Sequence, residues 1–297
     1  MAAMQPFLLR LADARPILLD GAMGTELERR GADTSTPLWS AQALLDQPEL
    51  VEQIHRDYLA AGAEVLITNT FRTHRHNLEP AGLGDRAAEL TALAVALAQN
   101  AVRASDRKAF VAGCMGPLED SYTANALPRA TYLAEHEQIA TNLAAAGVDL
   151  LLVETMSTIR EAEAAAQAAR ATGLPYGVSF ICKADGRMFS GEPVADAVKA
   201  VKPHQPDFFG INCSAAPTLQ TALANLSAAT RLPIAVYANP SHTEDYQHWG
   251  ETDAVQPAVY AKYAQRWLAA GAQLVGGCCG TGPEHIAAIH QLETISS

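Results

Sequence analysis

Short apolar runs alternate with longer amphipathic segments along the whole chain. Eight of these runs hold three to five residues and end at polar residues or glycine, and several are rich in valine and isoleucine. Runs of this length and composition are typical of buried strands in a parallel sheet. The predicted strands are Ile17–Leu19, Glu64–Thr68, Phe110–Ala112, Leu150–Val153, Tyr176–Phe180, Phe208–Ile211, Ile234–Tyr237 and Gln273–Val275.

The segments between and after these strands have apolar residues at helical spacing. Several of them end at a glycine just before the next strand, such as Gly62 and Gly147, and glycine suits the left-handed residue that ends a helix. The predicted helices are Pro48–Ala61, Arg86–Ala104, Ala130–Ala146, Thr158–Ala171, Pro193–Val201, Thr218–Thr230, Pro257–Ala270 and Pro283–Leu292.

Eight strand–helix units, spaced about 37 residues apart, match the number and spacing of units in a (β/α)8 barrel. A doubly wound sheet would usually have fewer strands or a domain break, and no Pro/Gly/Ser-rich linker interrupts this alternation. We therefore expect an α/β protein folded as a single TIM barrel domain over residues 1–297.

Composition and charge narrow the classes of function. The chain has 21 basic and 32 acidic residues, and a net charge of -11 repels the phosphates of nucleic acids. No stretch approaches the roughly 18 apolar residues of a membrane span, and residues 1–11 lack the pattern of a secretory signal. We expect no nucleic-acid partner, no membrane partner and a cytoplasmic location, while the oligomeric state does not follow from the sequence.

The cysteines suggest a metal site. Five cysteines, an odd number in a large chain, indicate reduced thiols rather than a disulfide framework. Cys213 follows the sixth predicted strand, and Cys278 and Cys279 follow the eighth. Because one neighbour separates these strands in a barrel, their thiols are expected to converge, and three sulfur ligands with one open position suit a reactive zinc site. Core packing of the vicinal pair, or a redox pair, remains an alternative; Cys114 and Cys182 are interpreted as core thiols.

Two carboxylates, Asp20 and Glu154, also follow predicted strands. Active sites of barrels lie at the carboxyl ends of the strands, and paired carboxylates there fit a glycosidase acid–base pair. They fit the binding of a substrate ammonium equally well. Asp20 could instead serve only to form the turn before Gly21. These interpretations stay open on the residues alone.

Three segments, Asp20–Thr25, Asn212–Ser214 and Gly276–Thr281, carry a resemblance to a known family. They are similar to the homocysteine S-methyltransferases, which include betaine–homocysteine methyltransferase, S-methylmethionine-dependent enzymes and the homocysteine module of cobalamin-dependent methionine synthase. The similarity runs from about Ile17 to Ile289. A separated cysteine followed by a vicinal pair is its most specific part.

The resemblance implies an enzyme that transfers a methyl group to the thiolate of L-homocysteine and forms methionine. It implies a zinc-containing barrel in which Cys213, Cys278 and Cys279 hold the metal. The implied substrate contacts are carboxylates for the amino group and backbone amides for the carboxylate: Asp20 and Glu154 for the first, and Gly21, Ala22 and Met23 for the second.

The methyl donor is less well determined. The sequence has no second domain large enough for cobalamin or a separate folate site, so we expect a donor that shares the barrel mouth or arrives on a partner. An acidic segment after the seventh strand, residues 244–253, suits a cationic donor, and Tyr246 and Trp249 in it could face a sulfonium. Other aromatic residues in predicted loops are Trp39, Phe71 and Tyr122. We expect S-methylmethionine first and S-adenosylmethionine second, ahead of betaine or methyl-folate.

Two other classes remain as alternatives. A non-catalytic zinc or thiol-sensing barrel would bind zinc but form no methionine. A metal-free carbon–carbon lyase of the Schiff-base type would need a lysine at a strand end, and Lys183, just past the fifth strand, is the nearest candidate.

Overall fold

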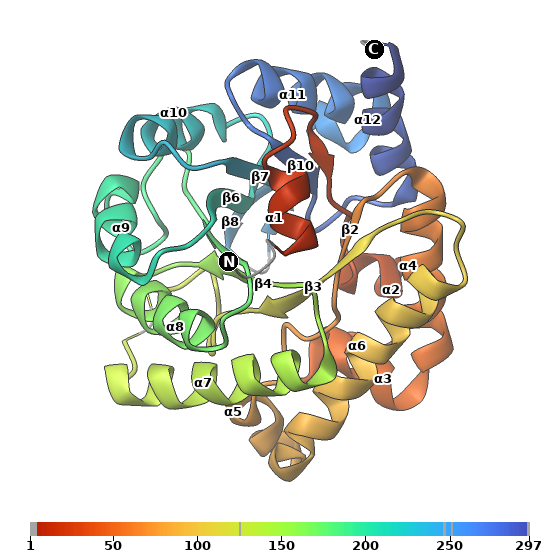
Figure 1. Ribbon diagram of the computed structural model, residues 1–297, viewed down its shortest axis with the longest axis vertical. Helices are drawn as coiled ribbons and strands as arrows, with labels where there is room; N and C mark the ends of the chain where they lie inside the picture. The colour runs from red at the N-terminus through yellow and green to blue at the C-terminus, as the bar shows by residue number, and fades with distance from the viewer. Residues whose placement is uncertain (1–4, 125, 246–247, 251, 296–297) are drawn as a thin grey trace.

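Eight parallel strands form the centre of the protein (Figure 1). The structure is a computed structural model that describes residues 5–124, 126–245, 248–250 and 252–295, without the side chains of residues 242–245, 248–249 and 293–295. The parallel strands are β1 (Ile17–Leu18), β2 (Val65–Ile67), β3 (Phe110–Met115), β4 (Leu150–Met156), β5 (Tyr176–Phe180), β6 (Phe208–Ala215), β7 (Ile234–Asn239) and β10 (Leu274–Gly277).

The strands are hydrogen-bonded in the order β1-β10-β7-β6-β5-β4-β3-β2. The two ends of this row also meet, because Leu19 forms a parallel bridge with Val65. The N–H of Asp20 donates to the carbonyl of Val65 at 3.0 Å, and the N–H of Glu64 donates to the carbonyl of Leu18 at 2.7 Å. The sheet therefore closes into a (β/α)8 barrel, which confirms the predicted fold class.

Helices surround the barrel and bury their apolar faces against the outer side of the strands (Figure 1). In α8 that face is almost entirely alanine, so the helix packs close to the sheet. The helices after β1 are α2 (Gly24–Arg29), α3 (Gln42–Asp46), α4 (Pro48–Ala61), α5 (Arg75–Leu78), α6 (Ala87–Arg103), α7 (Arg129–Ala146), α8 (Ile159–Ala171), α9 (Val194–Val201), α10 (Gln220–Ala229), α11 (Pro257–Ala269) and α12 (Pro283–Ile295).

Alternate strand residues fill the inside of the barrel, and a short helix closes one end of it. Helix α1 (Pro6–Leu11) lies across the barrel opening in Figure 1. Its Phe7 is 1% exposed and packs edge-on against Phe110 with ring centroids 5.4 Å apart, and against Phe208 at 6.2 Å. Because both partners begin strands, α1 covers the amino-terminal end of the barrel and leaves the carboxyl ends open.

The main helices agree with the prediction to within a residue or two, apart from the end of α12, but several strands are longer than predicted. Strands β3, β4, β6, β7 and β10 continue into polar or glycine residues that the pattern placed in loops. The prediction also omitted α1, α2, α3, α5 and an antiparallel hairpin of β8 (His242–Asp245) and β9 (His248–Gly250).

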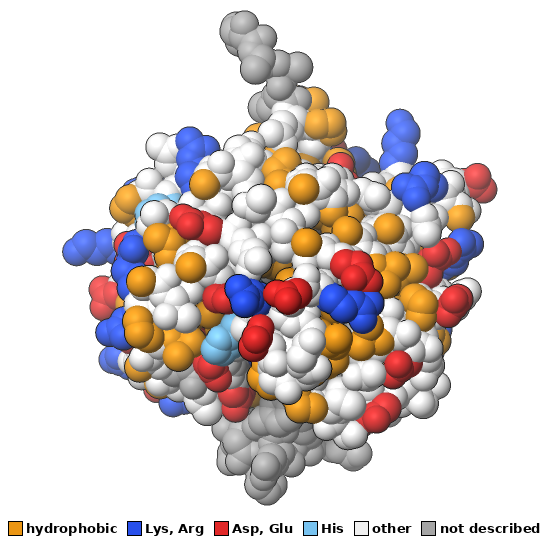
Figure 2. Space-filling view, turned by 90° about the horizontal axis from the view of Figure 1, so that it is seen from below, with side chains coloured by type: hydrophobic (Ala, Val, Ile, Leu, Met, Phe, Trp, Pro, Cys, Tyr) orange, Lys and Arg blue, Asp and Glu red, His pale blue; other side chains and the backbone are white. Residues whose placement is uncertain are grey.

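Acidic and basic side chains are interspersed on the face that Figure 2 shows, as far as the described residues cover it. Among the described residues, no helix has the length and apolar character needed to cross a membrane.

Candidate metal and substrate site

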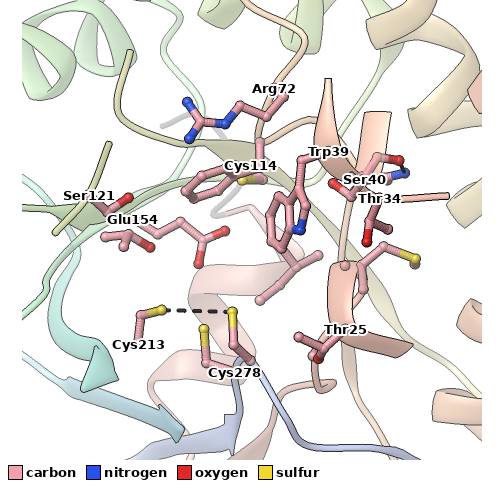
Figure 3. A pocket seen from close by; sticks show the side chains of 18 of the residues that line it. Thr25, Thr34, Trp39, Ser40, Arg72, Cys114, Ser121, Glu154, Cys213 and Cys278 are labelled. Atoms are coloured by element: carbon pink, nitrogen blue, oxygen red, sulfur yellow. Dashed lines mark hydrogen bonds between the residues drawn. The ribbon is translucent and has the colours of Figure 1, made fainter. Parts of the chain in front are cut away.

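A cavity of about 520 Å³ opens at the carboxyl ends of the strands (Figure 3). This is the end of a barrel where substrates bind, and the volume lies within the range of small-molecule sites. Most of the predicted site residues line the cavity, namely Gly21, Ala22, Met23, Glu154, Cys213, Cys278 and Cys279.

Strands β4 and β6 each have a bulge-like irregularity where they reach this cavity. The register of β4 against β5 shifts between Val153 and Met156, and Thr155 has a left-handed φ of 63°. The register of β6 against β7 shifts between Asn212 and Ala215, and Cys213 has a φ of 51°. An extra residue in a strand redirects the side chains around it. In β4 it lets both Glu154 and Thr155 line the cavity.

The three cysteine sulfurs lie together, as predicted from the strand order. The Sγ atoms of Cys213, Cys278 and Cys279 all lie within 4.8 Å of one another, and those of Cys213 and Cys279 are 3.9 Å apart. In Figure 3, Cys213 and Cys278 lie close together at the cavity, and the dashed line runs from Cys213 to the sulfur of Cys279. Ligands at 2.3 Å from a tetrahedral zinc ion are about 3.8 Å apart. The cluster therefore has the spacing of a three-thiolate metal site.

Cys213 has the environment of a thiolate. Side-chain hydrogen bonds from Cys278, Cys279, Tyr122 and Asn239 lower the pKa of Cys213 well below its usual range, although burial opposes them. The hydroxyl of Tyr122 is 3.3 Å from its sulfur, and the Nδ2 of Asn239 is 3.6 Å away. Asn239 also donates to the Cys213 carbonyl at 2.9 Å. Asn239 thus supports both the charge and the strained backbone of this residue.

Glu154 is a buried carboxylate at the same cavity. Its side chain is surrounded by neutral donors from Asn212, Cys114 and Tyr237. Burial raises its pKa to about 7, and the nearby negative Cys213 adds to this, while the hydrogen bonds from Cys114 and Tyr237 oppose it. Among the described residues that line the cavity, Arg72 is the one cationic side chain.

Asn212 connects the two strained strands. Its Nδ2 donates to Thr155 Oγ1 at 2.8 Å and to Glu154 Oε2 at 3.3 Å. Its Oδ1 accepts from the N–H of Thr155 at 2.9 Å and from Ser179 Oγ at 2.6 Å. Because Asn212 precedes Cys213, one fully buried amide ties the Glu154 carboxylate to the backbone that presents the first thiol.

A model of one protein family matches residues 17–292, and its description is homocysteine S-methyltransferase. The chain belongs to the homocysteine S-methyltransferase family. This confirms the resemblance of the three sequence segments and the predicted class of enzyme.

Relatives within the family cover nearly the whole chain. The homocysteine S-methyltransferase of Escherichia coli is 34% identical, over 92% of this chain and 94% of its own. The homocysteine S-methyltransferase YbgG of Bacillus subtilis is 33% identical, over 91% and 92%. The selenocysteine methyltransferase of Astragalus bisulcatus is 30% identical, over 94% and 92%.

Solved structures support the same assignment. Crystal structures of the homocysteine methyltransferase MmuM from Escherichia coli match with TM-scores of 0.83 in an oxidized form and 0.83 in a metallated form. Their sequences are 33% and 32% identical to this one, and the matches cover 96% and 97% of this chain and 99% of each MmuM chain.

Asp20 is the one predicted substrate contact that does not line the cavity. It is 1% exposed and is not among the described residues that line the cavity. Its Oδ2 accepts from the N–H of Ile67 at 2.8 Å, while its Oδ1 has no partner among the described residues. Burial raises the pKa of Asp20 well above its usual range, and the charge of Glu154 adds to this effect.

The aromatic residues of the predicted loops, of which Tyr246 and Trp249 were the predicted donor contacts, divide into two groups. Tyr246 lies outside the described residues, and Trp249 lies in β9 with its side chain undescribed. By contrast, Trp39, Phe71 and Tyr122 line the cavity. Trp39 and Phe71 meet edge-on at 5.7 Å, and Tyr122 meets Phe189 in the same way at 5.2 Å. Aromatic walls of this kind attract cations.

Cys114 and Lys183 differ in position from what the sequence suggested. Cys114 is buried, as predicted, but it lines the cavity beside Glu154 instead of packing in the core away from the site. Strand alternation could have found it, because Ala112 faces the barrel interior and Cys114 is two residues farther along. Lys183 is exposed, and its ammonium lies over the Phe189 ring at 5.5 Å, so it is not at the cavity as a Schiff-base lysine would be.

Proposed function

We propose that this enzyme transfers a methyl group from a small cationic donor to the thiolate of L-homocysteine and forms methionine, with a zinc ion held by Cys213, Cys278 and Cys279. The observation that carries the proposal is the cluster of three sulfurs at one cavity with a buried carboxylate beside it. Among the described residues, no fourth protein ligand joins the cluster. One coordination position would therefore stay open for a substrate, as in reactive zinc sites.

The acceptor thiol has to be ionised in order to react. A free alkyl thiol has a pKa of about 8.5, so only a few per cent is thiolate at pH 7. Zinc in this site would lower that pKa and keep the incoming sulfur ionised. The chain's own contribution is the spacing of the three thiols, together with the hydrogen bonds that Tyr122 and Asn239 give to Cys213.

Recognition of the acceptor falls to the residues around the cluster. Glu154 would accept the ammonium of homocysteine. Asp20 does not line the cavity itself, but its Oδ1 has no partner among the described residues and is the second acceptor proposed for the same ammonium. The backbone of Gly21, Ala22 and Met23 would receive the carboxylate. An ammonium beside Glu154 favours its ionised form and so compensates for the cost of burial.

The reaction needs alignment more than proton transfer. One carbon–sulfur bond forms to the homocysteine sulfur while the bond from the methyl group to the donor breaks, and the donor atom keeps the electron pair. A sulfonium thereby leaves as a neutral thioether, so no acid has to protonate the leaving group. This agrees with a cavity lining without histidine or lysine among the described residues. Holding sulfur, methyl carbon and leaving atom in line supplies most of the catalysis.

The donor is proposed to be a sulfonium, S-methylmethionine first and S-adenosylmethionine second. Trp39 and Phe71 offer aromatic surfaces, and Glu28 and Asp120 place carboxylates on the same lining. These features favour a cationic methyl donor over methyl-folate, and betaine, whose quaternary ammonium is also cationic, is the alternative donor. Tyr246 and Trp249 remain candidate donor contacts on the sequence alone.

A parallel assay tests the donor. Enzyme loaded with zinc is incubated with homocysteine and one of S-methylmethionine, S-adenosylmethionine, betaine or methyl-folate, and methionine is quantified. We expect the fastest turnover with S-methylmethionine, and Trp249→Ala should raise the KM of that donor while sparing the KM of homocysteine. Turnover with betaine or methyl-folate and with neither sulfonium would contradict the proposal. Zinc binding without methionine from any donor would favour a sensor.

Removal of one thiol tests the metal site. Cys213→Ser should lose both zinc and activity, because an alcohol stays protonated where a thiol ionises. Cys114→Ala is the matched control: this cysteine lines the same cavity but lies outside the cluster, so its variant should keep one zinc per chain. Metal analysis of the purified proteins gives the answer, and full zinc content in Cys213→Ser would contradict the assignment.

A further inference from the structure

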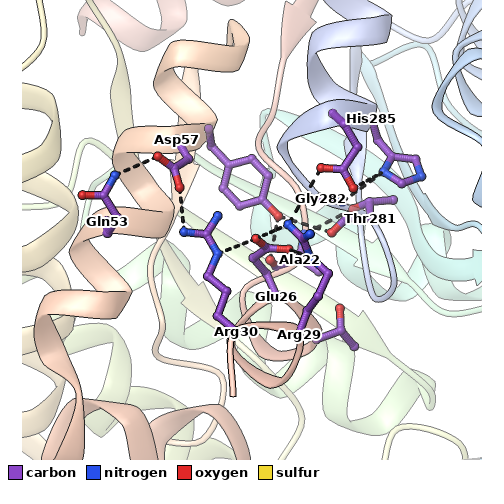
Figure 4. Close-up of polar contacts among 12 residues, drawn as sticks. Ala22, Glu26, Arg29, Arg30, Gln53, Asp57, Thr281, Gly282 and His285 are labelled. Carbon is purple, nitrogen blue, oxygen red and sulfur yellow. Dashed lines mark hydrogen bonds and ion pairs between the residues drawn. The ribbon is translucent and has the colours of Figure 1, made fainter. Parts of the chain in front are cut away.

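The loops after β1 and β10 lie side by side at the cavity, and the side chain of Thr281 joins them (Figure 4). Thr281 is 2% exposed and lies in the turn between β10 and α12. Its Oγ1 accepts a hydrogen bond from the N–H of Ala22 at 3.3 Å and donates one to the carbonyl of Cys278 at 2.8 Å. A single hydroxyl thus bonds the backbone of both loops.

Tyr58 makes a second connection from behind the loops. Its hydroxyl, on α4, donates to the carbonyl of Ala22 at 2.7 Å and lies 3.3 Å from the carbonyl of Thr281. A third connection runs from the N–H of Gly280 to Thr25 Oγ1 at 2.8 Å. The loop after β10 therefore cannot shift along the loop after β1 without breaking several hydrogen bonds, and those that Thr281 and Tyr58 make with Ala22 are buried.

Glycines on both loops make room for the threonine. A Cβ atom at Gly21 would lie 2.8 Å from Thr281 Oγ1, and one at Gly277 would overlap the same side chain. Neither glycine has a left-handed backbone conformation. Their lack of a side chain is therefore explained by the close approach of Thr281, joined at Gly21 by Tyr58, and not by the conformation of the chain.

The two joined loops carry the two ends of the acceptor site in the function proposed above. Cys278 and Cys279 are on one loop, and the backbone of Gly21 to Met23 is on the other. We propose that Thr281 is a positioning residue that sets the distance between the metal-binding thiols and the backbone that receives the substrate carboxylate. It thereby selects thiol amino acids whose sulfur and carboxylate span that distance. The inference rests on the proposed function.

The experiment compares two thiols that differ only in the carboxylate. Calorimetry measures the binding of L-homocysteine and of 3-aminopropane-1-thiol to the zinc-loaded wild type, T281V and T281S, and metal content is measured for each. Valine keeps the shape of threonine without the hydroxyl. T281V should bind homocysteine about tenfold more weakly, as expected for a misplaced hydrogen-bonded carboxylate. It should keep its zinc and its affinity for the aminothiol, and T281S should behave as the wild type.

Each other outcome has a distinct meaning. Unchanged homocysteine affinity in T281V, equal losses for both thiols, or loss of zinc would overturn the positioning role. A wild type that binds no zinc, or does not prefer homocysteine to the aminothiol, would instead overturn the proposed function itself. If T281V does not fold, Tyr58→Phe keeps the ring and removes the second connection, and it should show the same selective loss for homocysteine.

Discussion

Thr155 and Cys213 have left-handed backbone conformations, which residues other than glycine rarely adopt, and both residues line the cavity. Such a conformation costs on the order of 1–3 kcal/mol and persists only where its surroundings enforce it. Here the side-chain amide of Asn212 binds the N–H of Thr155, and that of Asn239 binds the carbonyl of Cys213. Two asparagines therefore hold the strained residues that present Glu154 and the first thiol.

Glu154→Gln tests the role of this carboxylate. Loss of a charge-assisted hydrogen bond of roughly 1.5–3 kcal/mol should weaken homocysteine binding by about one to two decades and leave the zinc in place. Calorimetry and metal analysis measure the two quantities. Glu28→Gln, which removes another carboxylate of the same cavity, is the control and should change homocysteine affinity little. Normal homocysteine binding with lost turnover would assign Glu154 a chemical role instead.

Wild type and Glu154→Gln should also differ in how their affinity for homocysteine depends on pH. The pKa of Glu154 is raised to about 7, so below that pH the carboxyl is increasingly protonated and should accept an ammonium less well. Wild-type homocysteine affinity should therefore fall more steeply than that of Glu154→Gln as pH decreases from 8 to 6. The acceptor thiol releases its proton in both proteins, so the difference between their profiles isolates Glu154. Parallel profiles would contradict this assignment.

Some site residues could be predicted from the sequence pattern, and others could not. The three clustered cysteines could be predicted because strand order alone brings the ends of β6 and β10 near each other. Asn212, Tyr237 and Thr281 could not be assigned in this way, because their importance lies in hydrogen bonds to atoms far away in the chain. Asn212 reaches Glu154 across 58 positions, and Thr281 reaches Ala22 across 259.

At the level of whole elements, helices were easier to predict than the ends of strands. Amphipathic spacing and terminal glycines or prolines mark both ends of a helix such as α4. By contrast, β4 and β6 continue through polar residues to Met156 and Ala215, since the strands of a barrel extend beyond the apolar core at their carboxyl ends, where sites lie. The bulges in these strands also break the alternation on which strand prediction rests.

Helix α1 gives a prediction at this scale. Phe7 fills the amino-terminal end of the barrel against Phe110 and Phe208, so Phe7→Ala should reduce the free energy of unfolding by about 3–5 kcal/mol. Leu9→Ala on the same helix removes a side chain that is 56% exposed and should change stability little. Denaturant unfolding measures both. Because α1 lies at the end opposite the cavity, a raised KM for homocysteine in Phe7→Ala would contradict this division of roles.

For the molecule as a whole, the barrel could be predicted from repetition, because eight similar strand–helix units without a domain break match the number of units in a closed (β/α)8 barrel. The dependence of its stability on pH is harder to predict, because burial shifts the pKa of a histidine and the pKa of a carboxyl group in opposite directions. Burial lowers the pKa of His55 to about 4 and raises that of Glu154 to about 7. His55 is 0% exposed, and neither ring nitrogen has a partner among the described residues.

The two groups should shift stability in opposite directions on acidification. Between pH 6.5 and 4 the unfolded chain protonates His55 and the native protein does not, so stability falls by about 1.4 kcal/mol per pH unit. Between pH 7 and 4.5 the native protein protonates Glu154 and the unfolded chain does not, so stability rises at a similar rate. The difference in free energy of unfolding between His55→Leu and wild type should therefore be about 2 kcal/mol more favourable to the variant at pH 5 than at pH 7.5. For Glu154→Gln the same difference should be less favourable to the variant at pH 5, by a similar amount. Urea unfolding at both pH values measures these differences. A shift of the same sign in His55→Leu and Glu154→Gln would contradict the argument.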